Sequence, residues 1–150
     1  ILLHSNKVVV CSLAPSHPVL DSTKYKIQSI NFVQQLNEEM KGKHKHNAKI
    51  VNINQPICKI NCKLHPELKQ EKCFTIYSCL NAKLIEINQR LESDPGLLQS
   101  KPDTEGFICV LLPKLDSIKE QLSQLKNHNE YLKLRGNYLS SSQIADIAEN

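Results

Sequence analysis

Residues 58–79 read CKINCKLHPELKQEKCFTIYSC and hold four of the six cysteines of the 150-residue chain. Cysteines this close together hold a metal ion, form a redox centre or form structural disulfides. A redox centre usually needs a Cys-x-x-Cys pair at the start of a helix, and neither pair in this stretch has that spacing. The choice between metal and disulfides therefore decides the compartment and the class of protein.

The metal interpretation treats four side chains as zinc ligands, because thiolates and imidazole suit tetrahedral zinc. They are Cys58, Cys62, His65 and Cys73. Structural zinc sites usually pair two short knuckles, whereas the second cysteine pair here is too widely spaced. We therefore expect no metal. The alternative function is an intracellular helical adaptor or scaffold, in which zinc bound by these four residues would stabilise the fold.

Disulfides account for the even number of cysteines and for thiols that lie off the predicted apolar seams. We predict that all six are oxidised in an extracellular compartment: Cys11, Cys58, Cys62, Cys73, Cys79 and Cys109. The sequence does not choose among the pairings. A bond between Cys11 and Cys109 would tie the N-terminal lead to a helix, and bonds within residues 58–79 would tie the long connection to a helix.

The composition favours an all-α fold. The chain has four glycines and no tryptophan, so Leu, Ile and Val fill the core, which suits helix-on-helix packing better than a glycine-rich nucleotide fold.

The net charge of +4 is scattered along the chain, so we expect no nucleic-acid partner. Apolar runs fall far short of the roughly 20 residues that span a bilayer, so we expect no membrane insertion. Without a catalytic constellation or phosphate-binding loop, we expect no enzyme activity and no cofactor.

Apolar residues at three- and four-residue steps predict helices over residues 22–41 and 66–92, and a third run that DTEG (103–106) caps and Gly136 ends. KIVNIN (49–54) has the alternation of a short strand within the long first connection. Residues 1–20 read as an irregular lead and 137–150 as a weakly structured tail. We expect one helical-bundle domain over residues 1–150.

The segment CKLHPELKQEKCFTIYSCLNAKLIEINQRLESD (62–94), with Cys79, Leu80, Leu84 and Ile87, resembles the region that leads into the second helix of the helical cytokines. The likeness is to the long-chain interleukin-six and granulocyte colony-stimulating factor group, with the short-chain type as a variant. It implies a four-helix up-up-down-down bundle with long crossover loops and a short final helix. It also implies a secreted signalling ligand for a cell-surface cytokine receptor, with a second secreted subunit as a further partner.

The resemblance assigns receptor contacts to polar faces of the first and third predicted helices. These residues are Gln28, Gln35, Glu38, Glu39, Asp116, Glu120, Asn127 and Tyr131. A second binding function follows from the basic loop GKHKHNAK (42–49), whose charge suits a heparin-like polyanion. The lysines for that polyanion are Lys41, Lys43, Lys45 and Lys49.

Overall fold

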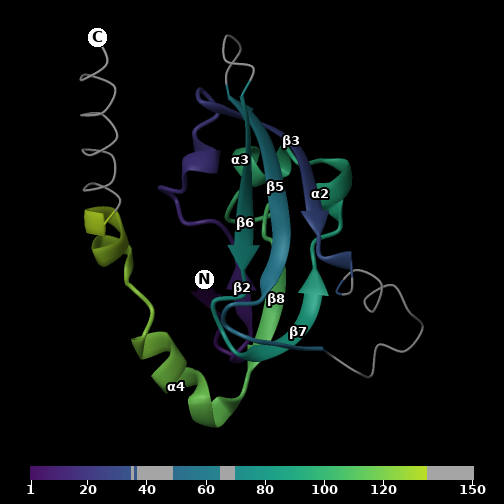
Figure 1. Cartoon of the computed structure of the whole chain (residues 1–150). Coiled ribbons are helices and arrows are strands. Elements are labelled where there is room, and N and C mark those ends of the chain that lie inside the picture. The colour runs from purple at the N-terminus through teal and green to yellow at the C-terminus, as the bar shows by residue number, and fades with distance from the viewer. Residues whose placement is uncertain (35, 37–48, 65–69, 135–150) are drawn as a thin grey trace. The chain divides into compact units, whose positions relative to one another are not determined.

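The computed structural model describes residues 1–34, 36, 49–64 and 70–134. The chain forms two compact units, Ile1–Ile118 and Lys119–Asn150. The first unit is built from two antiparallel sheets, which Figure 1 shows as two layers of arrows. The prediction of an all-α four-helix bundle is therefore wrong.

One sheet has five strands in the order β1-β2-β8-β7-β4. Their bounds are β1 (Leu2–Leu3), β2 (Val9–Cys11), β8 (Cys109–Pro113), β7 (Ala82–Ile87) and β4 (Ile50–Val51). The other sheet has three strands in the order β3-β5-β6. These are β3 (Tyr25–Phe32), β5 (Pro56–Leu64) and β6 (Glu71–Tyr77). The helical elements are η1 (Pro18–Leu20), α2 (Arg90–Ser93), α3 (Leu97–Ser100) and α4 (Leu115–Ser123), and residues 128–134 of the second unit are also helical.

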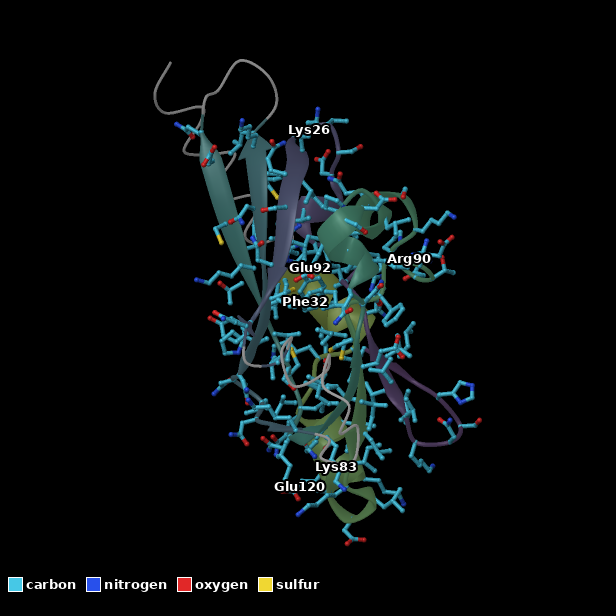
Figure 2. All side chains as sticks on the ribbon, turned by 90° about the vertical axis from the view of Figure 1, so that its right-hand side faces the viewer. Lys26, Phe32, Lys83, Arg90, Glu92 and Glu120 are labelled. Carbon is cyan, nitrogen blue, oxygen red and sulfur yellow. The ribbon has the colours of Figure 1, made fainter. Side chains whose placement is uncertain are left out.

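The core lies between the inward faces of the two sheets. The five-stranded sheet contributes Val9, Leu84 and Leu111, each fully buried, and the three-stranded sheet contributes Ile30 and Ile60. These residues are aliphatic and alternate with outward-facing neighbours, as expected for antiparallel sheets with one face on the core. Figure 2 places Phe32 midway between Lys26 and Lys83, which lie towards opposite ends of this unit.

Two β-bulges explain why strands were mistaken for helices. A bulge lies between Ile27 and Ser29 in the pairing of β3 with β5, and another between Leu84 and Glu86 in the pairing of β7 with β8. Because a bulge inserts one extra residue in the strand, two successive inward-facing residues are three positions apart there instead of two. The buried residues Ile27 and Ile30, like Leu84 and Ile87, therefore have the three-residue spacing that we assigned to a helix.

The first two predicted helices correspond mainly to strands, and the third predicted helix is helical only from Leu115 on. Residues 22–41 contain β3, residues 66–92 contain β6 and β7, and the third run contains β8 before α4 begins at Leu115. Residues 1–20, expected as an irregular lead, hold β1, β2 and η1. Strand β4 lies within KIVNIN, where a short strand was expected. The predicted tail, 137–150, lies outside the described residues.

The scarcity of glycine misled the fold prediction, because two turns use other residues where glycine is usual. Lys7, in the turn between β1 and β2, has a φ of 68°, and Cys79, between β6 and β7, has a φ of 60°. Left-handed backbone is costly for residues with a Cβ atom, so glycine normally fills such positions. The number of glycines therefore understated the number of tight turns.

Candidate functional site

Apolar side chains line the outward face of the five-stranded sheet. Across β1, β2 and β8 the register places Leu2 opposite Val10, and Val10 opposite Val110. The residues before and after Val10 and Val110 in the sequence are buried in the core. Because side chains alternate along a strand, Val10 and Val110 point outward. One continuous apolar row therefore crosses three strands.

A second row lies beside the first, on β8, β7 and β4. Lys83 of β7 is opposite Leu112 on one side and Ile50 on the other. Ile85, at the bulge of β7, adds another exposed side chain. We define the apolar outer face as the six aliphatic residues of these rows, which are Leu2, Val10, Ile50, Ile85, Val110 and Leu112.

The apolar outer face is open to solvent in this structure. The exposed fraction is 52% for Leu2, 61% for Ile50 and 42% for Ile85. Leu112, Val10 and Val110 are half-buried. An exposed cluster of aliphatic side chains from five strands usually marks a contact surface.

The outward face of the three-stranded sheet is polar instead. Its cross-strand rows consist of Lys26, Lys63 and Glu71, then Ser29, Asn61 and Cys73, then Asn31, Lys59 and Thr75. The Ser29 hydroxyl oxygen accepts hydrogen bonds from the side-chain amides of Asn31 at 3.2 Å and Asn61 at 3.0 Å. The two outward faces of one unit thus differ sharply in chemistry.

A hollow of about 380 Å³ opens on this polar face. It is lined by Gln28, Ser29, Asn61, Cys62, Glu71, Lys72 and Cys73. Burial, and to a smaller extent the neighbouring Cys73, raise the pKa of the Cys62 thiol to about 11. Cys62 is therefore a neutral thiol at physiological pH and not an activated nucleophile.

All six cysteines are free thiols in this structure. That all six form disulfides stays a prediction. Register places Cys11 directly opposite Cys109, the one pairing singled out from the sequence.

The three described zinc ligands of the alternative function do not converge. Cys58 and Cys62 lie on the same strand four residues apart, which is about 13 Å at 3.3 Å per residue. Cys73 lies on β6 and points to the opposite face of that sheet from the buried Cys62, and His65 is outside the described residues. Across residues 1–34, 36, 49–64 and 70–134, no group of three or more His, Cys, Asp or Glu side chains is placed to hold a metal ion.

The described residues among those assigned to a receptor lie on different kinds of element. Gln28 lies at the bulge of β3, whereas Asp116 and Glu120 are exposed on α4. Asn127 caps the helical turn over 128–134, where its side-chain oxygen accepts from the Glu130 N–H at 3.0 Å, and Tyr131 on that helix is half-buried. Gln35, Glu38 and Glu39 lie outside the described residues.

The proposed polyanion loop is also largely outside the described residues. Of its four lysines, only Lys49 is described, and it is half-buried. Lys41, Lys43 and Lys45 are not described.

Sequence reasoning missed the apolar outer face. The signal was present in VVV (8–10) and in CVLL (109–112), which are apolar at consecutive positions rather than at alternate ones. A strand that is apolar on both faces reads as a continuous run. We considered these runs only as membrane spans that were too short. Within the described ranges, no helix combines the length and apolar character that crossing a membrane would require.

Comparison with known proteins identifies the family. The family model for the glycine cleavage H-protein matches residues 68–136. Protein Abitram of Homo sapiens is 39% identical over 145 residues, which cover 91% of this chain and 76% of the relative. Protein Abitram of Bos taurus is 39% identical over 136 residues, covering 87% and 69%, and that of Danio rerio is 35% identical over 136 residues, covering 87% and 73%. This chain is a β-rich protein with a similarity to the H-protein, and it belongs to the Abitram family.

This family membership overturns the resemblance to helical cytokines. The region that carried the resemblance, 62–94, forms strands β6 and β7 and the short helix α2 rather than a long helix. The secreted signalling function, the cytokine receptor and the second secreted subunit were inferred from that resemblance, and they are wrong with it. The extracellular location, which was predicted from the cysteines as well, is also wrong.

The H-protein model describes a lipoyl-binding domain, in which the acyl group is carried as an amide on a lysine. Lys72 on β6 does not fit that group, because its Nζ lies 5.2 Å from the ring centre of Phe74 and 5.9 Å from that of Tyr25. Such contacts depend on the positive charge, which acylation would remove. Lys63 is opposite Glu71 in the ladder, an arrangement that also favours the charged amine. Lys63 and Lys72 therefore do not fit a lipoyl arm.

Proposed function

We propose that this protein is an intracellular binding module without catalytic activity, which holds a helix of a partner protein on its apolar outer face. The single observation that carries the proposal is the contrast between the two outward faces. The three-stranded sheet has a polar outer face, as is usual for a surface in contact with water. On the outer face of the five-stranded sheet, the exposed fraction is 61% for Ile50 and 52% for Leu2. If both outward faces exposed aliphatic side chains to the same extent, the apolar residues of the five-stranded sheet would not indicate a specific contact surface.

A helix is the occupant that this surface fits. The apolar residues lie on the face of a twisted sheet, and a sheet that is apolar on both faces is usually covered by helices on the second one. The polar groups among the apolar rows are Lys83 and Glu86, which have opposite charges. We therefore expect an amphipathic helix that presents aliphatic residues and carries both signs of charge beside them.

Matched substitutions on the two outward faces test this function. Ile85→Asp puts a carboxylate on the apolar outer face, and Thr75→Asp puts the same group on the polar face of β6. Proteins captured from a cell extract by the wild-type chain are identified, purified and titrated against each variant. Because burying one aliphatic side chain contributes about 1.5–3 kcal/mol, Ile85→Asp should weaken binding at least about tenfold, and Thr75→Asp should not.

Hydrogen exchange of the purified complex identifies the surface independently. Contact with the helix should slow exchange in β7 and β8 and leave β5 and β6 unchanged. Equal affinity of the wild type and a correctly folded Ile85→Asp variant would contradict the proposal, as would protection confined to β5 and β6. Fractionation of cells with an antibody to the untagged protein tests the intracellular location, and recovery from the medium would refute it.

A further inference from the structure

Three buried cysteines from different strands, Cys11, Cys58 and Cys109, come near one another in the core, and the exposed Cys79 lies beside them. Cys11 on β2 and Cys109 on β8 are direct partners in the antiparallel ladder. Cys58 on β5 and Cys79 in the β6–β7 turn are close enough to raise the pKa of Cys109. The cluster thus contains one cross-strand pair and two further thiols, from both sheets.

The pair Cys11 and Cys109 has the geometry of a disulfide before any bond forms. Directly opposed residues of an antiparallel ladder have Cα atoms about 4.5 to 5.5 Å apart. A disulfide joins Cα atoms about 4.4 to 6.8 Å apart, so the backbone need not move. The two side chains already share a hydrogen bond and point into the same interior, with exposed fractions of 8% for Cys11 and 1% for Cys109.

The surroundings make Cys11 the nucleophile of the pair. The thiol of Cys109 donates to the Cys11 sulfur, and this hydrogen bond lowers the pKa of Cys11 below its ordinary value. The same hydrogen bond, together with burial, raises the pKa of Cys109. Burial alone raises the pKa of Cys58 to about 12, so the third core thiol stays protonated. Cys11 is therefore the member of the pair that loses its proton more readily.

We propose that Cys11 and Cys109 form a reversible cross-strand disulfide that clamps β2 to β8 when the surrounding thiol pool becomes oxidising. The proposal goes beyond the binding function and does not depend on it. Nothing in the fold must rearrange to accommodate the bond.

The reaction needs a small disulfide such as oxidised glutathione. The Cys11 thiolate attacks one sulfur, so that a mixed disulfide forms and one glutathione thiolate leaves. Cys109 then loses its proton, attacks the Cys11 sulfur and releases the second glutathione. Two cysteine thiols are oxidised, the small disulfide is reduced to two glutathione molecules, and the two cysteine protons end on them.

Access to the pair is through the start of the chain. Strand β2 is only three residues long, and its outer neighbour β1 is only two residues long and exposed. Short strands at the edge of a sheet open locally more easily than the core. A disulfide would prevent that opening and would join residues far apart in the chain, so it should raise the thermal unfolding midpoint by about 10 °C.

The test uses the full chain, equilibrated with mixtures of reduced and oxidised glutathione and then alkylated and digested. We expect a peptide that joins Cys11 to Cys109, its loss on adding dithiothreitol, and a higher unfolding midpoint in the oxidised sample. Cys73→Ser should keep the linkage, because Cys73 is exposed on β6. Cys11→Ala and Cys109→Val should each abolish both the linkage and the rise in the midpoint.

Phenylarsine oxide, which bridges two adjacent thiols, gives a second measurement without oxidation. One equivalent should bind the reduced wild type and protect Cys11 and Cys109 from alkylation, and Cys11→Ala should bind none at this pair. Six alkylatable thiols under oxidised glutathione would overturn the proposal. A linkage of Cys79 to either member of the pair, or a bond that dithiothreitol cannot reduce, would overturn it too.

Discussion

The side-chain amide of Gln99 on α3 donates a hydrogen bond to the main-chain oxygen of Val19 in η1 at 2.6 Å, although 80 residues separate them. The same amide donates to the oxygen of Tyr25 at 2.9 Å. One side chain therefore ties a short helix to the segment that leads into the three-stranded sheet. Short helices such as α3 have little stability of their own, so such contacts hold them in place.

Removal of this amide should destabilise the first unit. Gln99→Leu keeps the size of the side chain but leaves two part-buried carbonyl groups without this donor. We expect a loss of about 1–3 kcal/mol in the free energy of unfolding, measured by urea denaturation. Gln124→Leu, at an exposed position, is the control and should change the free energy by less than about 0.5 kcal/mol. Equal effects of the two substitutions would contradict the role of Gln99.

Two glycines should respond differently to alanine. A Cβ atom on Gly106 would lie 2.5 Å from the carbonyl oxygen of Leu97 and 2.7 Å from that of Lys101. Both neighbours are backbone atoms, so the loop must shift, and Gly106→Ala should cost about 1–3 kcal/mol. A Cβ atom on Gly96 meets only the Asp94 carboxylate at 3.4 Å, so Gly96→Ala should be close to neutral. Thermal melts of both variants measure the difference, and similar midpoints would show that the loop adapts.

Alkaline pH should destabilise the fold partly through Cys58. Burial raises its pKa in the folded protein from 9.0 to about 12. The unfolded chain therefore loses this proton first, and stability that is fully present below pH 9 decreases as the pH rises towards 12. One such group contributes a slope of up to about 1.4 kcal/mol per pH unit.

Chemical denaturation between pH 8 and 11 measures that slope. Cys58→Ala should start less stable because of the cavity, but its stability should decline less steeply. Cys73→Ala removes an exposed thiol and should keep the slope of the wild type. The same slope in Cys58→Ala and in the wild type would assign the alkaline loss to other groups.

Lys63 and Lys72, on the described strands of the β5–β6 hairpin, should carry no lipoyl group. The contacts of Lys72 with Phe74 and Tyr25 depend on its free ammonium group. When the full chain is expressed in cells that lipoylate their own carrier proteins, peptide mapping by mass spectrometry should find Lys63 and Lys72 unmodified. A mass increase that matches a lipoyl amide and maps to Lys63 or Lys72 would contradict this expectation and restore a carrier function.

The cysteines show that sequence spacing does not predict which thiols lie close together in the fold. Their even number and the closeness of Cys58, Cys62, Cys73 and Cys79 in the sequence pointed to bonds within one stretch. In the fold, Cys58 and Cys62 are held four residues apart on one strand, and Cys58 lies near Cys109 instead. Which thiols meet depends on how the sheets pair, and cysteine spacing does not carry that information.

The sequence by itself determined an aliphatic core, a cysteine-rich stretch over residues 58–79 and apolar runs too short to cross a bilayer, because these follow from residue types and run lengths. Only the tertiary structure decided that the runs are strands, that Ile85 and Ile50 face outward and that Cys11 opposes Cys109. The physical reason is that a single bulge changes the apparent period of a strand, and that register is set by pairing between distant segments. Neither effect is visible in the local spacing of apolar residues.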